Sequence, residues 1–590
     1  MDAPKKRRTF GNILFTMHFA AKYSPLYFWM KMLLAALNAV QGFVEGVLAV
    51  KILLDIMEYG RPFSDALWFI LAFFGLAVLL NLLNNYMSSY VAPRGQEQLS
   101  AGMNRILFDK AAALDLSCYD SPEFYNDFVW SISEANPKMN AMLDKTAELI
   151  RSSMELFMIG ALFIFLNWVG LAFVALIVVP GLVISKIANE IQYELDTENL
   201  LDKRKSSYIG RLFYLADYAK EIRLFNMAGR LKKDYSETHA KIRATMKKYN
   251  ARIAMLRGND FMAGTYFILG LYLLYLIFLK VVRQSIGFGD IVALFNAIKS
   301  LHWEINGTKE QALELYADTL YIERLRQFLE YESAIVSGNL PVPQKPCIIE
   351  IKDVSFAYGG EPVLQNVSLI IKPGEKIAIV GYNGAGKTTL VKLLMRLYDP
   401  TEGEILLDGV NIKEYCLTGY RRKIGTVFQD YQIFAATLYD NVVLDTSKGH
   451  KKNVKAALAK SGFAEPLPVE TPLTREFMDD GVNLSGGEAQ KVAIARTFFK
   501  QADYLIFDEP SSALDPISEY NMNNAMRDAS VGKTVVFISH RLSSTKMADK
   551  IYMFENGKII EAADHDTLMK NDGKYAEMFK MQAKRYRSAY

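Results

Sequence analysis

Long apolar runs in the first 330 residues constrain the fold of this 590-residue chain more than any other feature. Bilayer hydrocarbon offers no water to backbone N–H and C=O groups, so only helices and closed barrels can span it. A spanning helix needs roughly 20 apolar residues. Runs of about that length or longer occupy residues 26–56, 66–90, 150–187 and 261–282, and a last run begins at Ile291. These lengths predict membrane-spanning helices and argue against a buried helical bundle in a water-soluble protein.

The spacing of the apolar runs predicts six spans. Residues 150–187 are broken at 167–170 and by Pro180, so we interpret them as two helices joined by a minimal turn. The connections are then short, long, minimal, long and short. The two long connections are polar and rich in Lys and Arg, which favours the cytoplasmic side; they are residues 94–140 and 189–259. The pattern predicts an all-α six-helix transmembrane domain, residues 25–330, with long cytosolic helical extensions.

The segments that flank this membrane region differ from it in composition. Residues 1–24 begin with a basic stretch, continue with a short aromatic segment and lack a small-residue cleavage site, which predicts a cytosolic tail and an interfacial helix. Residues 331–347 include a stretch rich in proline and polar residues, as expected of a linker. Residues 348–590 alternate short apolar strands with helical patterns, which predicts a soluble α/β domain.

The glycine-rich stretch Gly381–Thr389 defines the chemistry of the α/β domain. It follows the apolar strand 377–380 and leads into a helix that opens with Lys-Thr, which is the P-loop pattern. Its backbone N–H groups can converge on phosphate oxygens, Lys387 can reach the β- and γ-phosphates, and Thr388 can ligate Mg²⁺. The residues predicted to bind ATP are Tyr358, whose ring can stack on adenine, and Gly381, Tyr382, Asn383, Gly384, Ala385, Gly386, Lys387, Thr388 and Thr389.

Further polar residues lie at or near the ends of predicted strands. Asp508 ends a buried strand and can hold Mg²⁺, and the adjacent Glu509 is placed to polarise the attacking water. His540, at the tip of another strand, can hydrogen-bond the γ-phosphate, and Gln429 can reach the metal or the water. The predicted catalytic residues are Lys387, Gln429, Glu509 and His540, and the predicted Mg²⁺ ligands are Thr388, Gln429 and Asp508.

A second anion site is predicted at Ser485, Gly486 and Gly487, because these residues begin a helix whose first N–H groups have no intrahelical partner. The α/β domain has one P-loop, so this second site has no ligand of its own within one chain. A head-to-tail dimer, in which the site closes on the ATP of the other copy, is the simplest arrangement.

With these motifs the chain resembles an ATP-binding cassette exporter, a half-transporter with one six-helix membrane domain ahead of one nucleotide-binding domain. The resemblance covers nearly the whole chain and implies ATP and Mg²⁺ as cofactors and a D-loop that includes Asp515. The segments near Asp120 and Lys220 resemble the coupling regions of the family. The signature is LSGGE where the family usually has LSGGQ. Because Glu488 lies in the first turn of a helix, where an acidic side chain suits the dipole, we expect activity.

Polar residues within the spans are candidates for a substrate pocket, since placing them in lipid is costly. Asn38, Gln41 and Glu45 share one face of the first predicted helix, at i, i+3 and i+7. Hydrogen bonding between helices is the favoured role for Asn38. The predicted pocket residues are Gln41, Glu45, His302, Trp303 and Glu304.

Composition adds to these expectations. The net charge of +4 is small for this length and does not favour nucleic-acid binding, and the three distant cysteines suggest a reducing compartment. We predict an ATP-hydrolysing homodimeric exporter surrounded by membrane lipid in a bacterial cytoplasmic membrane, with its N-terminus and nucleotide-binding domain in the cytoplasm. Its substrate would be an amphipathic or hydrophobic drug, lipid or peptide. Two alternatives remain: a heterodimer with a related half-transporter, and an ATPase coupled to a channel or regulatory membrane function.

Overall fold

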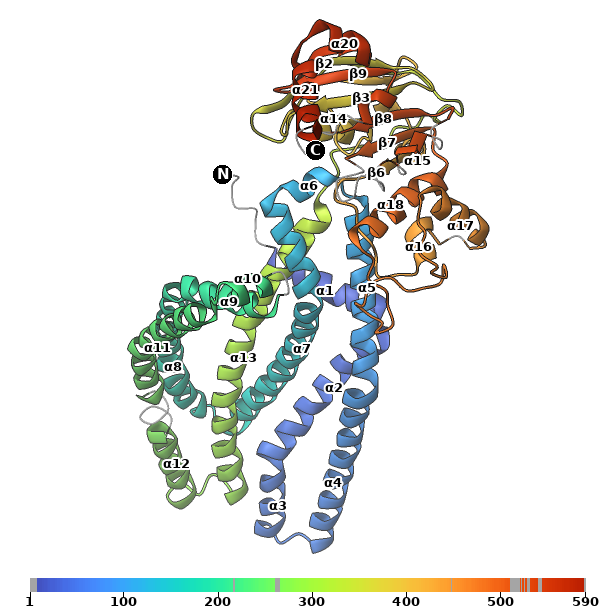
Figure 1. Ribbon diagram of the computed structural model, residues 1–590. Helices are drawn as coiled ribbons and strands as arrows, with labels where there is room; N and C mark the ends of the chain where they lie inside the picture. Colours follow the sequence, from blue (N-terminus) through green and yellow to red (C-terminus); the bar gives the residue numbers. More distant parts are fainter. Residues whose placement is uncertain are drawn as a thin grey trace. The chain divides into compact units, whose positions relative to one another are not determined.

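The computed structural model describes residues 8–587 apart from 216–217, 260–265, 447, 510–519, 521–522, 525, 528–530 and 540–543. The chain divides into two compact units, whose elements are labelled in Figure 1. The first comprises Met1–Ala112 and Asn126–Glu330, and the second comprises Ala113–Tyr125 and Tyr331–Tyr590. The short segment 113–125 therefore groups with the C-terminal unit, although in sequence it lies within the predicted membrane region.

The membrane region is helical. Two π-helical turns, η1 (Val44–Leu48) and η2 (Met87–Val91), join α2 to α3 and α4 to α5 without a break. The α-helices of this region are α1 (Thr9–Tyr23), α2 (Pro25–Phe43), α3 (Ala49–Glu58), α4 (Phe63–Tyr86), α5 (Ala92–Ala113), α7 (Pro122–Leu166), α8 (Gly170–Glu198), α9 (Leu200–Tyr214), α10 (Ala219–Leu224), α11 (Ala228–Asn259), α12 (Tyr266–Val281) and α13 (Phe288–Glu330).

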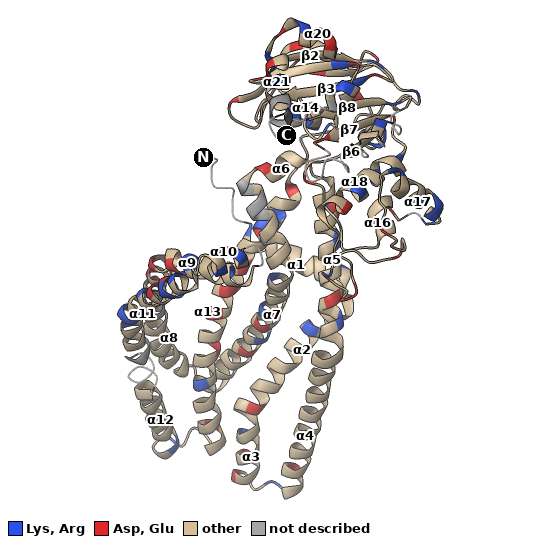
Figure 2. Ribbon diagram, in the orientation of Figure 1, with Lys and Arg blue, Asp and Glu red and all other residues tan. Residues whose placement is uncertain are grey.

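Four helical stretches among the described residues are long and apolar enough to cross a membrane: Pro25–Glu58, Phe63–Ala113, Ser131–Leu166 and Gly170–Glu198. Figure 2 shows few charged residues along α4 and α12 and many along α9 and α11. The predicted fifth span, 261–282, begins outside the described residues and continues as the apolar, 16-residue α12. The predicted sixth span lies in α13, a 43-residue helix that carries more charge. An all-helical membrane part with long helices is thus confirmed.

The predicted minimal turn is present between α7 and α8. A close approach there requires glycine, because a Cβ on Gly170 would lie 2.5 Å from the ring of Phe163. Pro180, which we expected to break the apolar run, lies inside α8 and does not end it. A proline removes one backbone hydrogen bond, and the helix continues because its other backbone groups have no water to bond to in a bilayer.

The N-terminal helix α1 is fastened to α13. Asn12 Nδ2 donates to the carbonyl of Thr319 at 3.1 Å and to the carboxylate of Glu323 at 2.7 Å. Arg326 in turn donates to Asn12 Oδ1 at 2.9 Å. The helix predicted to be interfacial therefore has one side held against the long helix that precedes the linker.

The second unit has an α/β architecture built on two sheets. The larger has the order β10-β9-β3-β8-β7-β6, in which β9, β3, β8, β7 and β6 are parallel and β10 is antiparallel to β9. The smaller is antiparallel, with the order β2-β1-β4-β5. Because β3, β8 and β7 are adjacent and parallel, the segments that follow them meet at one edge of the sheet, where ligands bind in such folds.

The strands of these sheets are β1 (Ile349–Ala357), β2 (Pro362–Ile371), β3 (Lys376–Gly381), β4 (Glu402–Leu407), β5 (Val410–Asn411), β6 (Ile424–Val427), β7 (Tyr504–Asp508), β8 (Thr534–Ile538), β9 (Lys550–Glu555) and β10 (Lys558–Ala563). The helices of the second unit include α6 (Leu116–Asp120), α14 (Lys387–Leu394), α15 (Leu417–Arg422), α16 (Leu438–Val443), α17 (Lys451–Lys460), α18 (Gly486–Lys500), α20 (His565–Asn571) and α21 (Lys574–Arg587).

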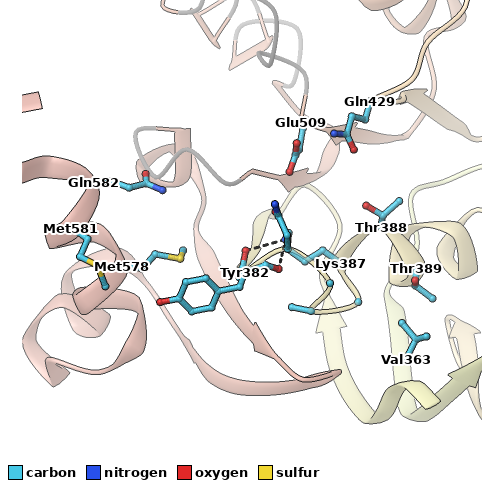
Figure 3. Close-up of a pocket in the computed structure, with 15 residues that line it drawn as sticks. Val363, Tyr382, Lys387, Thr388, Thr389, Gln429, Glu509, Met578, Met581 and Gln582 are labelled. Carbon is cyan, nitrogen blue, oxygen red and sulfur yellow. Dashed lines mark hydrogen bonds between the residues drawn. The ribbon is translucent and has the colours of Figure 1, made fainter. Parts of the chain in front are cut away.

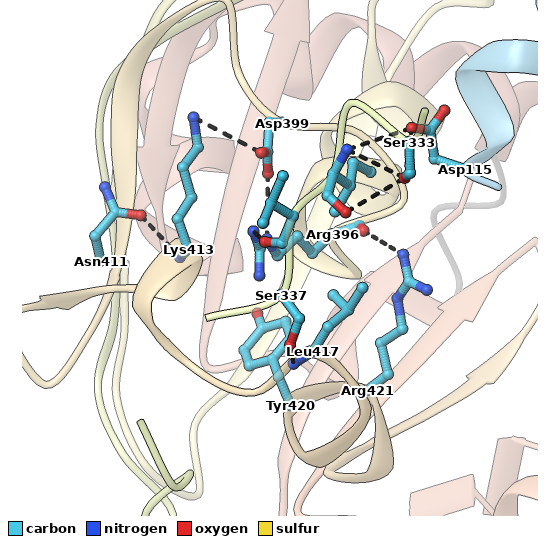
Figure 4. Close-up of polar contacts among 12 residues, drawn as sticks. Asp115, Ser333, Ser337, Arg396, Asp399, Asn411, Lys413, Leu417, Tyr420 and Arg421 are labelled. Carbon is cyan, nitrogen blue, oxygen red and sulfur yellow. Dashed lines mark hydrogen bonds and ion pairs between the residues drawn. The ribbon is translucent and has the colours of Figure 1, made fainter. Parts of the chain in front are cut away.

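Asp115 holds α6 to the rest of the second unit. Its carboxylate caps α6 by accepting from Cys118 N at 3.3 Å. Its Oδ2 accepts from Ala334 N at 2.6 Å and from Ser333 Oγ at 2.9 Å, and Figure 4 shows Asp115 beside Ser333. Burial opposes its ionisation, but hydrogen bonds from Ser117, Ser333 and Ala334 lower the pKa of Asp115 to about 2. The ionised Asp115 carboxylate therefore joins α6 to the segment that follows residue 330.

Asp120 makes the second contact of this segment. Tyr398 Oη donates to the Asp120 carboxylate at 2.6 Å, and the Tyr398 ring lies edge-on to Tyr358, with centroids 5.3 Å apart. The segment near Asp120 thus docks on the α/β domain beside the tyrosine that we predict to stack on adenine.

Replacing Asp115 with Asn is expected to lower the unfolding temperature of the second unit by about 5 °C, because losing a charged hydrogen-bond acceptor costs about 2 kcal/mol. The folded-state pKa lies below the unfolded value, so this stabilisation is fully present above about pH 4 and is lost as the pH falls through about 2. Thermal unfolding in detergent should therefore give the same decrease at pH 5 and pH 7. Asp479→Asn, on an exposed loop, is the control, and an unchanged unfolding temperature for Asp115→Asn would contradict this role.

Candidate functional site

The loop between β3 and α14 borders a cavity of about 1000 Å³. Gly381 and Gly386 have φ angles of +153° and +95°, and a Cβ would lie 2.3 Å from Phe554 O at the first position and 2.6 Å from Leu364 Cδ2 at the second. Both positions therefore require glycine, and such a loop lets successive N–H groups converge on an anion. The predicted residues that line the cavity are Gly381–Thr389, Gln429 and Glu509 (Figure 3).

Lys387, the first residue of α14, lies against the loop that precedes it. Its Nζ donates to the carbonyls of Gly381 and Tyr382, at 2.9 Å each. Burial lowers the pKa of Lys387, and the nearby carboxylates of Glu509 and Asp508 oppose that effect. A positive charge at this position can neutralise phosphate oxygens.

The end of β7 brings two adjacent carboxylates to the cavity. Asp508 is 3% exposed, and burial, followed by the charge of Glu509, raises the pKa of Asp508 to about 6. Glu509 has a φ of +48°, a left-handed conformation that is costly for residues other than glycine and often marks functional positions. Figure 3 shows Glu509 and Lys387 pointing toward one another, with Gln429 beside them.

The side chains around this carboxylate pair fit a divalent cation. Thr388 and Gln429 line the cavity with side chains that carry oxygen. Among the described residues, Oδ1 of Asp508 is buried and has no hydrogen-bond partner, which is the state expected of a metal ligand or a partner to one. Hydroxyl, amide and carboxylate oxygens are the donors that Mg²⁺ prefers.

Tyr358 lies beside the cavity and does not line it. Its hydroxyl is 3.4 Å from Thr389 Oγ1, and Lys392 Nζ lies 5.5 Å from its ring centroid. Phe356 and Tyr398 pack edge-on against it, with centroids 4.8 and 5.3 Å away. The ring is therefore held in place at the edge of the P-loop helix.

Ser485–Glu488 form the N-terminus of α18 and do not line the cavity. Glu488 carboxylate accepts from Ser485 N at 2.7 Å, and Glu488 N donates to Ser485 Oγ at 3.4 Å, which together form a capping box. The hydrogen bond from Ser485 N lowers the pKa of Glu488. The acidic residue in place of the family's usual glutamine thus has a structural role at this helix end.

Replacing Glu488 with Gln is expected to leave ATP turnover within about twofold of the parent, because glutamine completes the same capping box. Glu488→Leu, which cannot accept the hydrogen bond, is the contrasting variant and should be less active. Steady-state phosphate release measures both. A tenfold loss in Glu488→Gln would mean that the negative charge itself is needed.

Two of the predicted site residues lie outside the described residues. These are Asp515, predicted to belong to the D-loop, and His540, which follows β8 in the sequence. The cavity beside the P-loop is also lined by residues that belong to no recognised motif and that the sequence did not predict. These are Val363, Met578, Met581 and Gln582, of which the last three belong to α21. Their contribution depends on how α21 packs, which local sequence patterns do not indicate.

The first unit contains a second cavity, of about 750 Å³, bordered by α2, α4, η2, α5 and α7. None of the five predicted pocket residues, all of which the structure describes, lines it. Gln41 is half-buried, Glu45 and Trp303 are exposed, and His302 is buried. Glu304 reaches the cavity indirectly, because it accepts a hydrogen bond of 3.1 Å from Arg151, a lining residue.

Asn38 forms a reciprocal amide pair with Asn84 across two helices. The two hydrogen bonds measure 3.1 and 2.9 Å. Hydrogen bonding between helices, the role favoured for Asn38 from the sequence, is thus confirmed.

Fold and site together define a P-loop ATPase joined to a helical membrane part. A protein-family model described as ABC transporter matches residues 364–512. The chain is 31% identical to the ATP-dependent lipid A-core flippase of Paraburkholderia xenovorans (strain LB400), over 90% of this chain and 89% of that protein. It is 26% identical to the subtilin transport ATP-binding protein SpaT of Bacillus subtilis, over 97% and 96% of the two chains.

A solved structure of a bacterial Atm1-family ABC exporter with ATP bound has the same fold, with a TM-score of 0.72 and 23% identity over 96% of this chain and 99% of that one. The chain belongs to the ABC transporters. It is a half-transporter of the exporter type, an integral membrane ATPase in which the helical membrane part precedes the ATP-binding domain.

Proposed function

We propose that this exporter works as a homodimer in which each ATP lies between the P-loop of one copy and Ser485–Glu488 of the other. The observation that carries this proposal is the composition of the cavity of about 1000 Å³. The P-loop, Gln429 and Glu509 line it, whereas the helix N-terminus at Ser485 does not. The N-terminus of α18 can bind phosphate but does not border the P-loop cavity of its own chain, so we infer that it binds the ATP held by a second copy.

Within each site, Lys387 and the loop N–H groups hold the β- and γ-phosphates, and Tyr358 supports the adenine. Thr388, Gln429 and Asp508 are the proposed Mg²⁺ ligands, and the metal would neutralise charge on the phosphate oxygens. Glu509 orients and polarises the attacking water, and His540 bonds the γ-phosphate. Asp515 is proposed to act in the D-loop at the contact between copies.

The membrane part supplies the transport pathway. ATP-driven closure of the two ATP-binding domains would open the pathway outward, and hydrolysis would reset it. We place the protein in a bacterial cytoplasmic membrane with its ATP-binding domain in the cytoplasm. One relative is named for lipid A-core and another for the transport of subtilin, which supports an amphipathic lipid or peptide as substrate. Gln41, Glu45, His302, Trp303 and Glu304 stay candidate contacts.

Pull-down of differently tagged copies tests the homodimer. A tagged copy should retain an untagged one after solubilisation, and the absence of self-pairing would favour a heterodimer with a related half-transporter. ATP-dependent accumulation of a compound in inside-out vesicles tests transport. Ion currents without accumulation would instead favour the channel or regulatory alternative.

A further inference from the structure

The cavity of about 750 Å³ in the first unit, which we call the amide cavity, has a lining that few membrane segments offer. Asn81, Asn84, Asn85 and Ser88 all line it and follow one another at i, i+3, i+4 and i+7 on α4 and η2. Asn38 faces them from α2. Polar groups inside a membrane segment are costly, so a face of this kind requires an explanation.

Hydrogen bonding between helices explains only part of this face. Asn38 and Asn84 satisfy one another. Asn81 donates to Ala77 O of its own helix, at 2.9 Å. In the part of the chain that the structure describes, Asn81 and Asn85 make no hydrogen bond to another helix, and both are exposed on the cavity side. Apart from the bond of Asn81 to Ala77, their amide donors and acceptors are available to a ligand's own amide groups.

Carboxylates outnumber cations in the cluster of paired charges that borders the amide cavity. Lys31 and Arg151 line it, and each is already paired: Lys31 with Asp144, and Arg151 with Glu148 at 2.6 Å and Glu155 at 2.7 Å. Arg151 also pairs with Glu304 at 3.1 Å. Asp144 and Glu148 line the cavity, whereas Glu155 and Glu304 pair with Arg151 without lining it. The whole cluster therefore holds two cations and four carboxylates, and no lining cation among the described residues is left to hold a phosphate. The site therefore repels an anionic headgroup and favours a cation.

The depth of the amide cavity fits a substrate that enters from the cytoplasmic side. Asn81 and Ser88 lie 18 and 25 residues beyond Phe63, where α4 begins after a short turn. At 1.5 Å per residue these positions are about 27 and 38 Å from that end. The hydrocarbon core is about 30 Å thick, so with the short turns outside the cell the amide face lies at the inner boundary of the membrane.

We propose that the amide cavity binds a cationic segment of a peptide substrate, with Asn81 and Asn85 bonding peptide amides and the surplus carboxylates attracting basic side chains. This inference rests on the proposed export function and names the substrate class of its transport pathway. The volume is within the range of sites that hold drug-sized ligands, so it accommodates a few residues of a peptide at a time.

Peptide-stimulated ATPase activity tests the inference. The protein is reconstituted in phosphatidylcholine vesicles and given a synthetic Leu/Lys peptide or the same peptide with Glu in place of Lys. We expect stimulation by the basic peptide only, with a half-maximal concentration raised about fivefold in Asn81→Leu/Asn85→Leu. Leu82→Ala, on another face of α4, is the matched control and should respond as the parent does. Asp144→Asn, which releases Lys31, should increase the response to the acidic peptide.

The outcomes distinguish peptide binding in the amide cavity from the proposed export function. Equal stimulation by the acidic peptide, stimulation by phosphatidylglycerol vesicles instead of the basic peptide, or no effect of the double Asn substitution would overturn the inference. Each of these results leaves ATP-driven transport standing. Absence of ATP-dependent transport in the parent would instead count against the proposed function.

Discussion

Replacing Glu509 with Gln is expected to lower ATP hydrolysis by roughly 10²–10⁴-fold, the contribution of a positioned general base, which is the role we propose for this residue. Glutamine keeps the shape of the side chain and its place beside Lys387 but cannot accept the proton of the attacking water. ATP binding should be unaffected, because we propose that the loop N–H groups and Lys387, and not Glu509, hold the phosphates. The variant therefore accumulates as a closed, ATP-loaded dimer. Phosphate release and ATP retained after rapid gel filtration measure the two effects.

Lys387→Ala serves as the contrast, because it is expected to lose the bound ATP that Glu509→Gln should retain. It removes the ammonium that lies against the loop at Gly381 and Tyr382, so ATP retention and ATP-driven closure should both be lost. Glu361→Gln, on an exposed loop of the same unit, controls for the loss of a carboxylate and should hydrolyse ATP at the parental rate. If Glu509→Gln also hydrolysed ATP at that rate, another residue would have to be the base.

The ATP-binding side of this molecule was predictable because its determinants are local. Gly381 and Gly386 require their conformations within one loop, and Asp508 ends an unbroken apolar strand. Each pattern spans fewer than ten residues, and the local structure that it predicts does not depend on contacts with distant parts of the chain. The strands expected from these patterns are present as β3, β7 and β8.

The docking of α6 and the amide cavity depend on contacts distant in sequence. Asp115 bonds Ala334 across a separation of 219 residues, and no periodicity in either segment indicates that partner. In the membrane part, polarity identified residues such as Glu45, but the rotation of each helix decides which of them face a cavity. That rotation is set by packing, which brings Asn81 and Asn85 to the cavity and leaves Glu45 elsewhere.

Co-expression of two inactive variants tests the composite ATP site that the dimer requires. One copy carries Lys387→Ala, and the other carries Ser485→Tyr, whose ring would fill the space in front of the α18 N-terminus. In a mixed dimer, one ATP site then contains both substitutions. The other site contains the parental P-loop of one copy and the parental α18 N-terminus of the other. If copies pair at random, half of the dimers are mixed and each has one intact site, so about a quarter of parental turnover should return.

The matched control places both substitutions in one copy and co-expresses it with the parent. Every mixed dimer then has one substitution in each site, so mixed dimers should be inactive and turnover should come from parental pairs alone. A site complete within one chain predicts the reverse. The two singly substituted copies would then fail to restore activity, whereas the parental copy would stay active inside every mixed dimer. Because Ser485 lies apart from the cavity that holds Lys387, we expect the first pattern.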